Sequence, residues 1–220
     1  MSRIGWRLCA LTAAALLVAS QAWSFDLDQM LGPSPNWNSV MAPGTKVVSV
    51  ETALAHYGSH VPGDGIQGWN LGARIGWMPF GVWHVKRVPL VSGAMELGLE
   101  PLFQRFRTKN QNYAGLLAEV RYYFLDLSYG PLVPWISASI GPGGSDINLG
   151  AEGGTNRLTG PFLATIRGEV GEYYFIAAQQ AVYLGLQGEH FSNGGLNGAN
   201  RNFSLNTPWA GVLGYSWFFK

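Results

Sequence analysis

A histidine and a serine two residues apart have the chemistry and the spacing that nucleophilic catalysis needs. His190 and Ser192 stand at the end of the alternating run 181–193, which predicts a strand, and just before a stretch of mostly small residues. Residues i and i+2 of a strand point to the same face, with Cα atoms roughly 7 Å apart. An imidazole so placed reaches a neighbouring hydroxyl, as an activated serine nucleophile requires. The elements around the pair decide which face it occupies.

The first 24 residues predict a secretory signal peptide. A basic start precedes an apolar run at 8–19 and small residues suited to cleavage after Ala22 or Ser24. The alternative, a membrane anchor helix, needs a longer apolar run than this one. The only cysteine, Cys9, falls inside this leader. We therefore expect an exported mature chain without disulfides or thiolate metal sites.

Composition narrows the class of the remaining chain. The 220-residue sequence has a net charge of +1, which suggests no nucleic-acid partner, and only 12% of its residues are charged. It holds 30 glycines, 9 Trp, 9 Tyr and 11 Phe. After the leader, no apolar stretch approaches the length of about 18 residues that a transmembrane helix needs. Such a composition behind a signal peptide predicts a β-barrel. Residues 25–44 are expected to form an N-terminal periplasmic segment that covers one barrel end.

Eight segments of about ten residues alternate apolar and polar side chains, and they predict an all-β, eight-stranded antiparallel transmembrane β-barrel over residues 45–220. The segments are 46–57, 69–80, 91–103, 113–124, 132–140, 160–173, 181–193 and 208–219. The charged side chains share one set of faces and oppose the apolar ones: Glu51, Arg74, Glu96, Glu100, Glu119, Arg121, Arg167 and Glu169. In a membrane barrel the apolar set faces lipid, and charges of both signs pair inside.

Alternation alone fits a soluble periplasmic barrel that binds an apolar ligand inside equally well. Aromatic residues near the strand ends, such as Trp69, Trp77 and Trp217, favour the membrane because such residues form girdles at both interfaces. The last strand nearly ends in Phe219, as the last strands of bacterial outer-membrane barrels do, although Lys220 follows. We therefore predict that the barrel lies in the bacterial outer membrane.

The strand register also assigns a face to the candidate pair. His190 and Ser192 fall in the apolar, lipid-facing set. They also lie near the outer end of their strand, because the longer links are expected outside: 58–67, 104–112, 141–159 and 194–207. A catalytic pair at the depth of the outer leaflet implies a lipid substrate. The alternative is that both are interfacial polar residues at the point where the strand leaves the membrane.

The run from His190 to Leu196, His-Phe-Ser-Asn-Gly-Gly-Leu, resembles the His-x-Ser-Asn-small-Gly-Leu motif of the PagL-type lipid A 3-O-deacylases, an acyloxyacyl hydrolase-like outer-membrane family. The resemblance implies an eight-stranded outer-membrane barrel with its active site on the outer wall. It makes His190 the general base and Ser192 the nucleophile on an ester of lipid A, the lipopolysaccharide anchor in the outer leaflet. Asn193 and the adjoining Gly194 would help hold the oxyanion.

The third member of such a site departs from the family pattern. The family places an acid roughly fourteen residues after the histidine to orient the imidazole. That position here is Ser204, or Asn206 if the preceding loop carries a two-residue insertion, and the tail 191–220 contains no Asp or Glu. An Asn can orient a His, so Asn206 is the candidate, whereas Glu189 points to the other face.

The mechanism implied by the resemblance needs no cofactor. No metal site is predicted either, because His56, His60 and His84 lack the spacing of metal ligands. The glycine-rich stretches 141–144 and 150–154 do not open a helix after a strand, so we interpret them as outer loops rather than phosphate loops. Two hypotheses of different class remain: a lipid A esterase, and a structural or adhesive outer-membrane barrel without catalysis.

Overall fold

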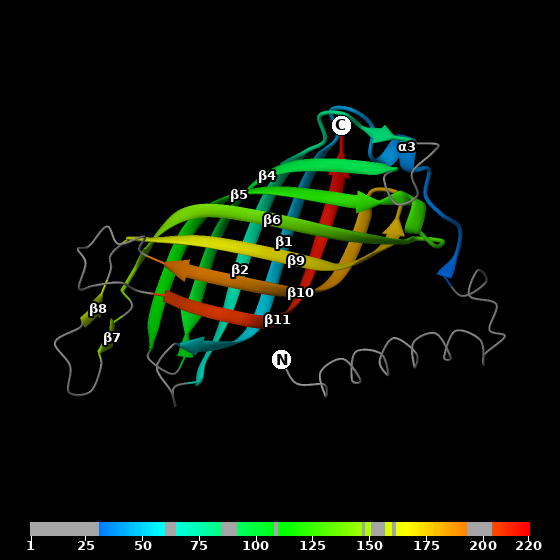
Figure 1. Ribbon diagram of the computed structural model, residues 1–220. Coiled ribbons are helices and arrows are strands. Elements are labelled where there is room, and N and C mark those ends of the chain that lie inside the picture. Colours follow the sequence, from blue (N-terminus) through cyan, green and yellow to red (C-terminus); the bar gives the residue numbers. More distant parts are fainter. Residues whose placement is uncertain are drawn as a thin grey trace, which may run out of the picture. The chain divides into compact units, whose positions relative to one another are not determined.

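The computed structural model describes residues 31–59, 65–84, 92–107, 110–146, 148–150, 157–159, 162–192 and 204–220 (Figure 1). The predicted signal peptide and the loop residues Asn193 and Gly194 lie outside these ranges. All of the described strands belong to the unit Ser34–Lys220. Among the described residues, no helix is long and apolar enough to cross a membrane.

Eight long strands form one closed antiparallel barrel, which confirms the predicted fold class. They are β1 (Lys46–Ser59), β2 (Gly65–Trp77), β4 (Gly93–Phe106), β5 (Gln111–Phe124), β6 (Leu132–Ser145), β9 (Phe162–Ala177), β10 (Gln180–Ser192) and β11 (Ser204–Phe219). Their order is β2-β1-β11-β10-β9-β6-β5-β4, and pairing of β2 with β4 closes the ring. The short strand β3 (Val82–Trp83) adds to β4, and β7 (Asn148–Gly150) pairs with β8 (Arg157–Thr159) in a separate hairpin.

The main departure from the predicted strands is at β6, which continues through the glycine-rich stretch that was expected to be a loop. Gly143 of β6 and Gly115 of β5 pair across the sheet, and the ring of Tyr113 lies against both on the inside of the barrel. A Cβ at either glycine would overlap that ring. The glycines therefore make room for a buried tyrosine within the strand. Neither β3 nor the β7–β8 hairpin was predicted, because each strand is too short to show an alternating pattern.

Side chains alternate between a buried interior and an exposed apolar wall. Large apolar residues such as Leu54, Ile75 and Leu184 are 72%, 67% and 65% exposed. Charged residues on the opposite faces of the same strands, such as Glu51 of β1 and Arg74 of β2, are buried. A soluble barrel would show the reverse arrangement, so the soluble alternative is wrong. The apolar wall and the polar interior are those of a transmembrane barrel.

Ion pairs between buried charges fill the middle of the interior. Three fully buried arginines pair with glutamates of their own strand or of other strands that face the interior: Arg74 with Glu96 and Glu119, Arg121 with Glu119 and Glu169, and Arg167 with Glu51, Glu100 and Glu169. Arg121 Nε lies 2.8 Å from Glu119 Oε1. Charges removed from both lipid and water need such partners, which explains why they share one face of the sequence pattern.

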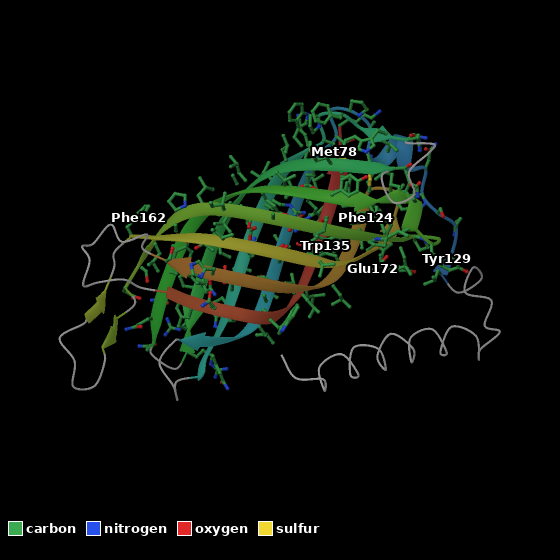
Figure 2. All side chains as sticks on the ribbon, in the orientation of Figure 1. Met78, Phe124, Tyr129, Trp135, Phe162 and Glu172 are labelled. Atoms are coloured by element: carbon green, nitrogen blue, oxygen red, sulfur yellow. The ribbon has the colours of Figure 1, made fainter. Side chains whose placement is uncertain are left out.

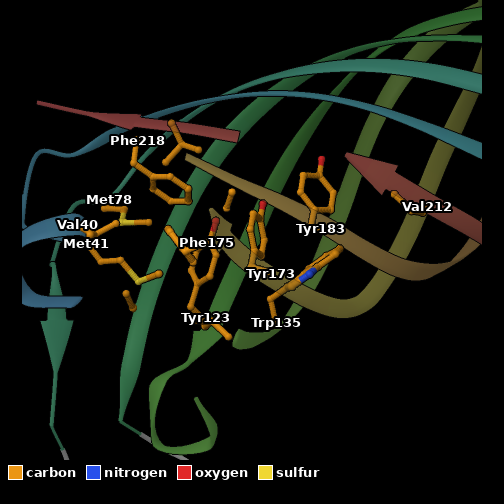
Figure 3. Packing of buried hydrophobic residues seen from close by; sticks show 14 of the residues in the cluster. Val40, Met41, Met78, Tyr123, Trp135, Tyr173, Phe175, Tyr183, Val212 and Phe218 are labelled. Atoms are coloured by element: carbon orange, nitrogen blue, oxygen red, sulfur yellow. The ribbon is translucent and has the colours of Figure 1, made fainter. Parts of the chain in front are cut away.

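Aromatic and apolar side chains fill the interior toward the end where β1 begins and β11 ends. Figure 3 shows Tyr173 and Tyr183 side by side, with ring centroids 4.7 Å apart. The short helix α3 (Trp37–Val40) contributes to this cluster, and its N-cap Asn36 accepts a hydrogen bond from the Ser39 N–H. The Trp37 ring contacts Phe175 edge-on at 5.0 Å. Residues 37–41 therefore close this end of the barrel, and its periplasmic orientation stays a prediction.

A charge on the outer wall is expected to destabilise the barrel. Leu71 stands at the middle of β2 and is 54% exposed. Leu71→Arg should lower the free energy of unfolding from lipid vesicles by about 2–4 kcal/mol, because an arginine near the bilayer midplane must leave water. Denaturant titration in vesicles measures this change, with Leu71→Ala as the control for lost side-chain volume. Equal effects of the two variants would contradict a lipid-facing position.

Candidate active site

The candidate pair lies at the C-terminal end of β10, on the face that belongs to the outer wall of the barrel. His190 pairs with Asn206 of β11 and with Ile166 of β9, and Ser192 pairs with Ala164 of β9. Both side chains are half-buried and follow the outward parity of the exposed Leu184 and Leu186, while the residues between them are buried inside. His190 and Ser192 therefore share the outward face that the alternation predicted.

Asn206 contacts the imidazole of His190. The Nδ1 of His190 lies 2.6 Å from the Oδ1 of Asn206. Because an amide oxygen only accepts hydrogen bonds, Nδ1 carries the proton in this contact and Nε2 keeps its lone pair. That tautomer is the one a general base needs when its second nitrogen faces the nucleophile. The predicted neighbour of His190 is thus in contact with it, and the catalytic role of each residue stays a proposal.

A shift of strand register brings Asn206 to the outward face. Gln187 pairs with Ala210, but Glu189 pairs with Thr207, so β11 has one extra residue between these two pairs. The same shift appears where β11 pairs with β1. A β-bulge of this kind reverses the alternation of the strand beyond it. Without the bulge, Asn206 would follow the inward parity of Ala210, and its side chain would not face His190.

Two inward-facing residues anchor the strand that carries the pair. The Phe191 ring packs edge-on against Tyr113 at 5.0 Å and against Phe106 at 5.9 Å. Glu189 accepts a hydrogen bond of 3.1 Å from Gln104 Nε2. These contacts hold β10 from inside the barrel at the residues that flank the candidate pair. The alternation of the sequence predicts that Phe191 points inward, but nothing in its residue type marks it as a support for the candidate pair.

Ser192 and His190 are neighbours on one face of β10, but their side chains do not form a hydrogen bond with each other. Within the described ranges, no hydrogen bond joins the Ser192 hydroxyl to the imidazole. Catalytic hydrogen bonds are often long in the absence of substrate and tighten in the Michaelis complex. The expected oxyanion residues Asn193 and Gly194 lie outside the described residues, so their role stays a prediction.

The other histidines do not join this site. His84 is exposed at the opposite end of the barrel, after β3, and the side chains of His56 and His60 lie outside the described residues. In the part of the chain that the structure describes, no group of three or more His, Cys, Asp or Glu side chains could hold a metal ion.

Comparison with known proteins relates the chain to outer-membrane barrels by fold alone. No protein-family model and no curated protein matches the sequence. Among solved structures, the outer-membrane enzyme PagL has a TM-score of 0.52 and 18% identity, covering 77% of this chain and 98% of its own. Neisserial surface protein A has a TM-score of 0.56 and 12% identity, covering 80% of this chain and 99% of its own. Together with the apolar outer wall, these likenesses place the chain among the bacterial outer-membrane β-barrels.

Proposed function

We propose that this barrel is an outer-membrane esterase that removes an ester-linked acyl chain from lipid A. The observation that carries the proposal is the contact of 2.6 Å between His190 Nδ1 and Asn206 Oδ1, with Ser192 two residues further along the same outward face. A histidine held by one ring nitrogen beside a serine is the arrangement that activates a hydroxyl nucleophile. The sequence motif from His190 to Leu196 supports the same assignment.

The proposed reaction proceeds through an acyl-enzyme. His190 Nε2 takes the proton of the Ser192 hydroxyl while the Ser192 oxygen attacks the ester carbonyl. Backbone or side-chain amides of Asn193 and Gly194 hold the resulting oxyanion. The sugar oxygen leaves with the proton from His190, and the acyl group stays on Ser192. A water then attacks the acyl-enzyme and gives a proton to His190, which passes it to the departing Ser192 oxygen, so that the fatty acid leaves and the free serine and the neutral imidazole are restored. No cofactor enters these steps.

The location of the pair supports a lipid substrate. His190 and Ser192 lie on the apolar outer wall at the end of the barrel opposite the chain segment 37–41. With the long links facing outward, that end reaches the outer leaflet, where lipopolysaccharide presents the ester bonds of lipid A. A substrate from water would have to enter the bilayer to reach these side chains, whereas a lipid diffuses to them within its leaflet.

The amide of Asn206 is expected to act as a positioning group. Asn206→Leu should lower kcat by on the order of 10²-fold, because the imidazole loses the partner that fixes its tautomer and orientation. Asn206→Asp should retain or raise activity, since a carboxylate also stabilises the imidazolium that forms in the reaction. The split between kcat and KM separates this role from a structural one: Asn206→Leu should lower kcat and leave KM unchanged. Unchanged kcat in Asn206→Leu would remove Asn206 from the site.

A second candidate function is a structural or adhesive barrel without catalysis. The absence of Asp and Glu from the tail 191–220 favours it, because an uncharged orienting group stabilises an imidazolium less than a carboxylate does. In that case His190 and Asn206 form an interfacial polar contact that ends the membrane-spanning part of the wall.

Lipid A mass decides between the two functions. Lipid A is extracted from cells with and without the barrel in their outer membrane and compared by mass spectrometry. The esterase should remove the mass of one hydroxy-acyl chain and release the matching free fatty acid. A fluorophosphonate should also label the peptide that contains Ser192. Unchanged lipid A in cells that contain the folded barrel, verified by its heat-modifiable gel mobility, would establish the non-catalytic function.

A further inference from the structure

One charged residue interrupts the apolar outer wall. Between the strand ends, Glu172 of β9 is the only charged side chain on the outward faces that the structure describes. Its pairing with Pro134 of β6 and Leu184 of β10 continues without a bulge, so Glu172 keeps the outward parity of the exposed Val170. The side chain is half-buried against the wall. An ionised carboxylate on a lipid-facing strand costs free energy unless it has a partner.

No described group of the barrel supplies that partner. Glu172 forms no hydrogen bond or ion pair with the described residues, and no charged side chain among them acts on it. Glu169 on the inward face of the same strand differs in this respect, because it accepts hydrogen bonds from Arg121 and Ser137. The cation that an ionised Glu172 attracts therefore comes from outside the described part of the chain.

The position of Glu172 along β9 brings its carboxylate near one edge of the apolar wall. Figure 2 shows Glu172 toward the end of the barrel that carries Phe124, away from Phe162. With a rise of about 3.4 Å per residue and a tilt of about 40°, β9 spans roughly 40 Å of depth, and Glu172 lies roughly 13 Å from its end at Ala177. This is a few ångströms inside a centred apolar band about 25 Å tall. An extended side chain brings the carboxylate back toward the headgroups.

A lipid headgroup fits this position better than a protein partner. The apolar neighbours Leu184, Val170 and Ile136 are 65%, 50% and 48% exposed, as is usual for the rest of the described wall, so no separate patch marks the footprint of a protein. Phospholipids surround the whole wall. A headgroup that ends in a primary ammonium offers both a positive charge and N–H donors, which are what an unpaired carboxylate takes.

We propose that Glu172 binds the primary ammonium of a phospholipid headgroup and so holds one lipid at a fixed place on β9. The ammonium balances the charge of the carboxylate and donates hydrogen bonds to it, and this pair is stronger at the edge of the bilayer than in water. A choline headgroup carries the charge but has no N–H to donate. With the long links outside, as predicted, the bound lipid belongs to the periplasmic leaflet. The site does not involve His190 or Ser192 and is independent of the esterase function.

Native mass spectrometry tests the binding. The full-length barrel in detergent is titrated with palmitoyl-oleoyl phosphatidylethanolamine and with phosphatidylcholine of the same acyl chains. The wild type should bind the ethanolamine lipid about tenfold more tightly, the effect of one charge-assisted hydrogen-bonded pair. Glu172→Gln should remove this preference, and Glu172→Asp should keep it. The matched control Leu213→Gln places the same amide on the exposed wall of β11 and should keep the preference of the wild type. Equal affinities for the two lipids in the wild type, or a preference that survives in Glu172→Gln, would overturn the proposal.

Carbodiimide coupling locates the contact. In vesicles that contain the ethanolamine lipid, an apolar carbodiimide should join the Glu172 carboxyl to the lipid amine as an amide, and the carbodiimide leaves as a urea. Peptide mass spectrometry should find the lipid adduct on the Glu172 peptide of the wild type and not on that of Glu172→Gln. An N-acylurea at Glu172 without a lipid adduct would show a carboxyl that no lipid amine reaches. Coupling of Glu172 to a protein in isolated outer membranes would show a protein partner instead, and either result would reject the lipid site.

Discussion

Ser192→Ala is expected to lower the rate of acyl release from lipid A by on the order of 10⁴-fold, because it removes the atom that forms the acyl-enzyme. His190→Ala should cost a similar factor, since the hydroxyl then has no base to take its proton. The two effects should not add. The double variant is expected to retain the same residual rate as either single variant, because a nucleophile without its base and a base without its nucleophile fail at the same step.

The measurement is release of fatty acid from lipid A by purified barrel in detergent, with retained fold verified by heat-modifiable mobility. Ser128→Ala and His84→Ala are matched controls, because both residues lie at the opposite end of the barrel. The controls should match the wild type. Additive losses in the double variant would show that Ser192 and His190 act separately, and full activity in Ser192→Ala would exclude it as the nucleophile.

Arg121→Leu should lower the free energy of unfolding by about 3–5 kcal/mol, the cost of leaving buried charges without a partner. The Arg121 guanidinium bonds Glu119 at 2.8 Å and Glu169 at 3.0 Å, and it donates to the Tyr173 hydroxyl at 2.7 Å. It also lies 3.9 Å from the centroid of the Trp135 ring. The substitution removes one positive charge from an interior whose described residues already include more glutamates than arginines, so buried carboxylates are left without a partner.

Denaturant titration in lipid vesicles measures this loss. Arg107→Leu at the exposed end of β4 is the control for removing a surface arginine, and we expect it to change stability by less than about 0.5 kcal/mol. Adding Glu119→Gln to Arg121→Leu should recover part of the loss, since it removes one of the carboxylates left unpaired. A single-variant effect no larger than that of Arg107→Leu would mean that the interior ion pairs do not stabilise the barrel.

The strand count and the faces of the barrel were predictable because a two-residue period repeats along the whole chain. A charged residue such as Arg121 or Glu169 on one face of most strands fixes which side is interior once lipid is outside. The same alternation placed His190 and Ser192 on the outer wall, where the structure has them. These features depend only on local sequence and on the difference between lipid and a closed interior.

Strand ends and the β-bulge were not predictable in the same way. β6 continues through Gly141–Ser145, where Tyr113, about thirty residues away in sequence, packs against Gly143. The bulge in β11 reverses the alternation, so continued parity from Ala210 would turn Asn206 inward, away from His190. Pro208 is the one local signal, because proline within a strand marks an edge or a bulge. Contacts between distant segments decide these details, and a single sequence does not display them.

The packed interior bears on how molecules reach and leave the outer wall. Large side chains fill the barrel from end to end, among them Trp135, Arg74, Arg121, Tyr113 and Phe191. The described part of the interior is therefore packed rather than open, and under the proposed function the substrate reaches the outward face of β10 sideways through the leaflet and its products depart the same way. Encounters there follow two-dimensional diffusion and depend on how many lipids of the right kind surround the barrel, not on concentrations in the water on either side.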